Sequence, residues 1–182
     1  MIRQRGASAA PVIQGHAETL PFGDNSFDAS MAILTVHHWA DKEKGLKEMR
    51  RVARGRVVVL TFDPSHRGSW LADYIPELAA LDDVRMPRMT DYGEWLGPVE
   101  ISAVPIPRDC TDGFLYAYWR RPAAYLDPRI RAAMSSFWAI DNASEGLEKL
   151  ARDLDTGAWA RRYAELLKLD ECDLGYRLVV AK

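Results

Sequence analysis

The 182-residue sequence has only two cysteines, Cys110 and Cys172, and no strong excess of charge of either sign. Two cysteines cannot form the dense disulfide framework of a small secreted domain, so free thiols in a reducing compartment are favoured over a single bridge. The 24 basic and 26 acidic residues give a net charge of −2. Because a nucleic-acid-binding protein concentrates Lys and Arg to displace counterions, we expect no nucleic-acid partner.

Long hydrophobic runs are also missing. The most apolar stretch, residues 57–62, is much shorter than the roughly 20 residues that a membrane-spanning helix needs. The basic start, residues 1–6, is not followed by the apolar segment of a secretory signal. A composition of 48% apolar and 27% charged residues is typical of a folded globular chain. We therefore expect a soluble, cytoplasmic protein with no membrane partner.

Three short apolar runs in the first third of the chain indicate strands covered on both faces, as in a parallel sheet: residues 11–14, 27–36 and 56–62. A helix pattern lies between the second and third runs, where Asp41 suits an N-cap and Gly55 suits a stop signal. Strand, helix and strand in this order predict a βαβ unit whose two strands are parallel.

The rest of the chain mixes helix and strand patterns. Strands are expected at residues 99–104 and 175–181. A helical pattern after Asp63-Pro64 is expected to kink at Pro76. Further helices follow from Asp127 onward, where Asn142 and Glu145 have the spacing of a capping box and Thr156 suits the N-cap of the last helix.

Several segments together carry a resemblance to a known family. Residues 14–28 read QGHAETLPFGDNSFD, and residues 34–39 read LTVHHW. A helix ending in Arg50-Arg51-Val52, the run VVVL at residues 57–60 and the ending LGYRLVV at residues 174–180 follow in the same order. In this order the segments resemble the class I S-adenosylmethionine-dependent methyltransferases, of the methyltransferase type 11 kind.

The resemblance implies an α/β fold with the Rossmann-like methyltransferase sheet. Two parts of the family pattern are not in the sequence: a G-x-G-x-G turn and the acidic residue that would hold the ribose hydroxyls. The chain therefore looks like the family without one opening βαβ unit, that is, N-terminally truncated. We expect a single domain, residues 1–182, in which residues 1–112 and 170–182 form the sheet core with flanking helices. Residues 113–169 are expected to form a helical insertion before the last strand.

The resemblance also implies which residues form the site. The predicted S-adenosylmethionine-binding residues form two groups, Gly15, His16, Ala17 and Glu18 near the adenine, and Thr35, Val36 and His37 near the methionine part. His16 stands where the family usually has an acidic residue. His37 is the candidate catalytic residue, as a general base that takes a proton from the acceptor. The alternative is that His37 and His38 are hydrogen-bonded to backbone groups at the end of a strand. The His and Cys residues have no metal-ligand spacing, so no metal is expected.

The function implied by the resemblance is methyl transfer from S-adenosylmethionine to a small-molecule acceptor. Because the Gly-rich turn and the ribose-holding residue are missing, we expect these 182 residues to bind the cofactor weakly or undetectably, as an incomplete or inactive form. Two alternatives stay open. One is a non-catalytic binding or assembly module with the same fold, and the other is a carrier that uses only an aromatic pocket for a small ligand.

The outer edge of the first long strand has a consequence for assembly. In the family strand order 3-2-1-4-5-7-6, the strand at residues 28–34 corresponds to strand 4, and its partner, strand 1, is missing. An unpaired apolar edge presents free backbone donors and acceptors to other chains. Either residues 12–14 fold back onto this edge or two copies of the chain associate there. We expect self-association into a homo-oligomer.

Overall fold

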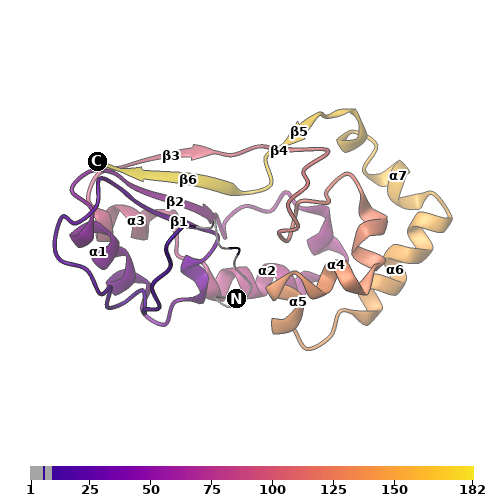
Figure 1. The fold of residues 1–182 in the computed structure, drawn as a ribbon. Helices are drawn as coiled ribbons and strands as arrows, with labels where there is room; N and C mark the ends of the chain where they lie inside the picture. The colour runs from indigo at the N-terminus through magenta and orange to yellow at the C-terminus, as the bar shows by residue number, and fades with distance from the viewer. Residues whose placement is uncertain (1–5, 7–9) are drawn as a thin grey trace.

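The fold is built around one four-stranded sheet. The computed structural model describes residue 6 and residues 10–182 (Figure 1). The strands of the sheet are β1 (Ser30–Ile33), β2 (Val57–Phe62), β3 (Val99–Ala103) and β6 (Tyr176–Ala181), in the order β1-β2-β6-β3. β1 and β2 are parallel, and β6 is antiparallel to both of its neighbours. This confirms the βαβ unit and the α/β fold, and the order matches the 4-5-7-6 part of the expected topology.

Two helices pack against one face of this sheet (Figure 1). α1 (Lys42–Val52) begins where the side chain of Asp41 accepts a hydrogen bond from the Lys44 amide at 2.9 Å, as the N-cap pattern predicts. α3 (Met89–Leu96), which the sequence pattern did not indicate, packs beside α1. Buried side chains join the two helices to the sheet, among them Ala32, Leu46, Val57, Val59, Tyr92 and Val179.

The opposite face and the outer edge of β1 are exposed. Met31 and Ile33 lie on that face and are 68% and 54% exposed. Within the described residues, β1 pairs with β2 alone. Residues 11–14 form no strand and are exposed, so the prediction of a strand there is wrong. The alternative in which residues 12–14 fold back onto the edge of β1 is not what the structure shows. These residues pair with no neighbouring strand, and apolar residues without a pairing partner do not form one. Self-association through the edge at residues 28–34 stays a prediction.

A helical part lies beside the sheet (Figure 1). Its elements are η3 (Trp70–Asp73), α2 (Pro76–Arg85), η4 (Pro122–Leu126), α4 (Pro128–Ala132), α5 (Ser135–Ala139), α6 (Ser144–Asp155), α7 (Ala158–Arg162) and η5 (Leu166–Lys168). They enclose a second core that contains the fully buried Leu78, Trp119 and Leu150. The short strands β4 (Ile106–Pro107) and β5 (Glu171–Cys172) pair in antiparallel orientation. The helices from η4 to η5 lie between these two strands in the sequence. No helix among the described residues is long and apolar enough to span a membrane.

Gly55 and Pro76 have different roles from those expected. α1 ends at Val52, before Gly55, and Gly55 lies against the carbonyl oxygen of Asp28, where a side chain would collide. Pro76 begins α2 and does not kink a longer helix. A proline in the first turn of a helix gives up no hydrogen bond and already has the helical φ angle.

The capping pattern around α6 also differs from the prediction. The Asn142 side chain accepts a hydrogen bond from the Ser144 amide at 2.8 Å, so it does not form the expected capping box with Glu145. The Thr156 hydroxyl donates to the carbonyl of Arg152 at 2.9 Å. Thr156 therefore ends α6 and does not cap the helix that follows.

Val179 and Val180 are neighbours on β6 that lie on opposite faces of the sheet, so replacing each of them shows which face is packed. Val179 is fully buried beneath the helices, whereas Val180 lies on the opposite face and is partly exposed. We expect Val179→Ala to lower the free energy of unfolding by about 2 kcal/mol, and Val180→Ala by less than half of that. Chemical denaturation of the two variants measures the difference, and equal losses would contradict the packing of this face.

Candidate functional site

The chain turns sharply where β1 ends. Leu34 has a φ angle of 46°, and its amide donates a hydrogen bond to the carbonyl of Leu60 at 2.9 Å. A positive φ is strained for a residue such as leucine, and strain of this kind is concentrated at functional sites. The turn leads into η2 (Val36–His38). It lies at the carboxyl ends of β1 and β2, the position at which open α/β sheets bind ligands.

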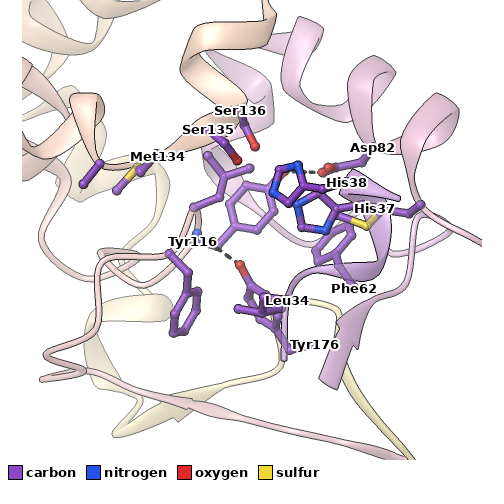
Figure 2. A pocket seen from close by; sticks show the side chains of 14 residues that line it. Leu34, His37, His38, Phe62, Asp82, Tyr116, Met134, Ser135, Ser136 and Tyr176 are labelled. Carbon is purple, nitrogen blue, oxygen red and sulfur yellow. Dashed lines mark hydrogen bonds between the residues drawn. The ribbon is translucent and has the colours of Figure 1, made fainter. Parts of the chain in front are cut away.

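A cavity of about 150 Å³ lies beside this turn (Figure 2). The ends of β1 and β2, the helices η2, α2 and α5, and the start of β6 contribute to its wall. The lining side chains labelled in Figure 2 are Leu34, His37, His38, Phe62, Asp82, Tyr116, Met134, Ser135, Ser136 and Tyr176. A mostly apolar and aromatic wall with a few polar groups is typical of a site for a small molecule.

Two adjacent histidines form one side of the cavity. The rings of His37 and His38 have centroids 3.9 Å apart. Burial, helped by the neighbouring His38 and by the positive charges of Arg85 and Lys42, lowers the pKa of His37 from 6.5 to about 4. Burial and Arg85 also lower the pKa of His38. His37 therefore lines the cavity as a neutral imidazole at neutral pH. Its role as a general base stays a prediction, and a pKa near 4 makes it a weak base.

A buried carboxylate, Asp82, stands in the same cavity. Asp82 is 4% exposed, and the hydroxyl of Tyr116 donates a hydrogen bond to its Oδ2 at 3.0 Å. Burial raises the pKa of Asp82 from 3.8 to about 6, against the opposing effect of the Tyr116 hydrogen bond. Burial, together with the negative charge of Asp82, raises the pKa of Tyr116 as well. At neutral pH the pair is therefore a carboxylate with a neutral phenol donating to it.

The predicted turn at residues 15–18 lies outside this cavity. The carboxylate of Glu18 accepts a hydrogen bond from the Asp41 amide at 3.1 Å, which fixes the turn to the start of α1. The same hydrogen bond lowers the pKa of Glu18. Gly15 and His16 are exposed. The Glu18 side chain thus has a structural partner already, while the backbone at Gly15 and His16 is accessible to a ligand.

A second hollow, of about 270 Å³, brings together two of the predicted cofactor residues. Ala17 and Thr35 both line this hollow, which lies between β1, α1 and the segment at residues 17–27. Val36 is only 1% exposed and packs in the core with the residues of α1, so its side chain lines neither hollow. Thr35 therefore belongs to one hollow and His37 to the other, and the segment from Leu34 to His38 separates them.

The sequence analysis missed Asp82, Tyr116, Phe62 and Tyr176 as residues of the cavity. A signal for Asp82 was present, because it follows Leu78 by four residues and so falls on the apolar side of a helix. A carboxylate at such a position is buried, and buried carboxylates are enriched at functional sites. The three aromatic residues gave no separate signal, since aromatic residues occur throughout both cores.

The comparisons with known proteins point in one direction. A sequence profile described as "Methyltransferase domain" matches residues 1–60. A crystal structure from Anabaena variabilis, of a candidate methyltransferase from an antibiotic biosynthesis pathway, is 37% identical, with a TM-score of 0.87 over 93% of this chain and 72% of that chain. The chain is also similar to the uncharacterized protein YafE of Escherichia coli, with 39% identity over 125 residues, or 63% of this chain.

A plant enzyme is among the more distant relatives. The chain is 29% identical over 97 residues, 53% of its length, to the chloroplastic 2-methyl-6-phytyl-1,4-hydroquinone methyltransferase 2 of Oryza sativa. The match spans 58% of the length of the Escherichia coli protein and 27% of the rice enzyme. The chain therefore covers less than two thirds of these curated relatives.

The raised pKa of Asp82 predicts a pH-dependent stability. Asp82 binds its proton more tightly in the folded chain, with a pKa of about 6, than at its usual value of 3.8. The fold therefore loses stability as the pH rises from about 4 to above 6, by up to about 3 kcal/mol. We expect Asp82→Asn, which carries no charge, to unfold at a higher temperature than the parent chain at pH 8. This advantage should disappear below pH 4.

Asp83→Asn is the matched control for this experiment. Asp83 is the next residue on α2, is exposed, and forms an ion pair with Arg67 at 2.8 Å. Its replacement should give no gain in unfolding temperature at pH 8. A gain of the same size in both variants would show that the general loss of negative charge, and not the burial of Asp82, is responsible.

Proposed function

The chain belongs to the class I S-adenosylmethionine-dependent methyltransferases, and from this premise we propose that it transfers a methyl group to a small acceptor held in the cavity beside His37 and Asp82. One observation carries the proposal: residues of a single segment, Thr35 and His37, line two neighbouring hollows. A cofactor in one hollow and an acceptor in the other would meet at this segment. Such a meeting point at the carboxyl edge of the sheet suits methyl transfer between two bound molecules.

The residues present suit one side of the cofactor. Gly15 and His16 are exposed and can contact the adenine, although the His16 carbonyl already accepts a hydrogen bond from the Thr19 amide at 3.1 Å. Ala17 and Thr35 line a hollow whose other side chains are almost all apolar, so it suits an uncharged part of the cofactor and offers no partner to its charged amino-acid group. S-adenosylmethionine supplies a sulfonium-bound methyl group that a nucleophile can take directly. The chain's own contribution is then to align the acceptor and to exclude water, which the buried aromatic wall of the cavity does.

Neutral His37 has a defined part in this alignment. A neutral imidazole has one nitrogen that donates a hydrogen bond and one that accepts. His37 can therefore either donate a hydrogen bond to a polar group of the methyl acceptor or accept one from it. Its low pKa keeps it neutral over the physiological pH range. We therefore propose orientation of the acceptor as the main role of His37. We propose the cytoplasm as the compartment of this activity, which the two free thiols of Cys110 and Cys172 support.

A second function is favoured by one specific observation. The sequence has no G-x-G-x-G turn and no acidic residue in the position that holds the ribose. A domain that lacks these contacts but keeps the fold could act as a non-catalytic binding or assembly module. The buried carboxylate of Asp82 at the cavity supports the catalytic proposal more than this one, because an assembly module has no use for it.

Nuclear magnetic resonance of the 182-residue chain tests the cofactor side of the proposal. With S-adenosylmethionine at millimolar concentration, we expect the amide signals of Gly15–Glu18 and of Thr35–His37 to shift. The affinity should be weak, because several hydrogen bonds of the complete family site are missing. A dissociation constant in the low micromolar range would contradict the expected weakness, and shifts confined to other segments would contradict the site.

A further inference from the structure

Asp82 has an oxygen that the protein leaves without a hydrogen bond. Its Oδ2 accepts from the Tyr116 hydroxyl at 3.0 Å, and no described residue donates to Oδ1. Asp82 as a whole is 4% exposed, but Oδ1 is not among the fully buried side-chain atoms that lack a partner, so it borders open space. Asp82 lines this cavity and also the hollow beside His66 and Arg67, and a molecule bound in the cavity can supply the donor to Oδ1.

The walls around Asp82 are aromatic. The Phe62 and Tyr116 rings have centroids 5.3 Å apart, and Phe114 packs edge-on against Tyr176 at 4.7 Å. Figure 2 shows Asp82, His37 and Tyr116 around one space. The cavity volume of about 150 Å³ is comparable with the volume that holds one benzene molecule in a dry protein cavity. This volume and the aromatic side chains of the lining suit a single flat ring.

We propose that Asp82 is the proton acceptor of the methyl transfer and that the methyl acceptor is a phenol, a single aromatic ring whose hydroxyl donates to Asp82 Oδ1. This rests on the proposed function. The proton of the phenol passes to Oδ1, and the phenol oxygen keeps the electron pair of its O–H bond. With that pair the oxygen would bond to the methyl carbon that S-adenosylmethionine supplies, the cofactor's sulfur would keep the electron pair of the broken bond, and Asp82 later releases the proton to water.

The electrostatic surroundings suit Asp82 to this role better than His37. A general base works best when its pKa lies near the working pH, and the pKa of Asp82 is about 6 whereas that of His37 is about 4. Tyr116 is a positioning residue, because its hydroxyl donates a hydrogen bond to Oδ2 of Asp82. The titratable and charged groups around Asp82 are Asp83 on its own helix, Arg67, Tyr116, Tyr176, His37 and His38, together with His66 and Asp73 in the second hollow that Asp82 lines.

Equilibrium binding of phenol to the 182-residue chain, without any methyl donor, tests the proposal. At pH 8 we expect phenol to bind more tightly than cyclohexanol, which has the same ring size but a more weakly acidic hydroxyl and no flat face. Asp82→Asn should weaken phenol binding about tenfold, because a hydrogen bond to a charged acceptor becomes one to a neutral acceptor. Asp83→Asn should leave it unchanged.

The pH profile separates this role from a merely structural one. Phenol affinity of the parent chain should fall as the pH drops through about 6, whereas Asp82→Asn should show no such step. Tyr116→Phe should move the midpoint to higher pH, because it removes a hydrogen bond that favours the ionised carboxylate. If Asp82→Asn does not fold, the pH midpoint of phenol binding by Tyr116→Phe tests the proposal instead. An unchanged midpoint would contradict it.

Three results would overturn the proposal: no phenol binding by the parent chain, equal binding by Asp82→Asn, or an affinity that does not change with pH. None of them bears on cofactor binding, since no donor is present. Failure of the cofactor site would instead be seen in the S-adenosylmethionine titration.

Discussion

The position of β6 between β2 and β3 is the constraint on which both the sheet and the cavity depend. β6 pairs with the whole of β2, so that Tyr176 lies opposite Phe62 at the carboxyl edge. Gly175, just before the strand, has a φ angle of 94°, and a Cβ there would lie 2.8 Å from the Phe62 ring. The Tyr176 hydroxyl in turn accepts a hydrogen bond from the Tyr116 amide at 3.4 Å. One antiparallel strand therefore completes the sheet and fixes the wall of the cavity.

The first half of the sheet could be predicted from the sequence because its signals are local. The apolar runs, the Asp41 cap and the helix between the strands are all contained in residues 27–62, and the structure has them in the predicted order. The strand expected at residues 11–14 is absent because a strand needs a pairing partner as well as apolar residues. α3 was missed because Arg88, the residue before it, has no acceptor side chain to cap the helix; instead, the Asp91 carboxylate accepts a hydrogen bond from the Arg88 amide at 2.8 Å.

The site could be predicted only in part, for the same reason. Ala17, Thr35 and His37 follow motifs that lie close together in the sequence, and the structure places each of them at one of two hollows. The pairing of Asp82 with Tyr116 joins residues 34 positions apart through the packing of α2 against a loop. A sequence pattern of one helix shows that Asp82 faces the core, but it does not show what it meets there. The buried pair of Asp82 and Tyr116 was therefore the part of the site that the sequence predicted least.

The central proposal is that Asp82, a buried carboxylate in the cavity at the carboxyl edge of the sheet, takes the proton of the methyl acceptor. Carboxyl carbon-13 resonance of the labelled chain, followed against pH and assigned with Asp82→Asn, measures the proton affinity of this group directly. The account predicts a titration midpoint for Asp82 near pH 6, well above its usual 3.8. A midpoint at or below 3.8 would show that the carboxylate is solvated or paired, and would contradict the account.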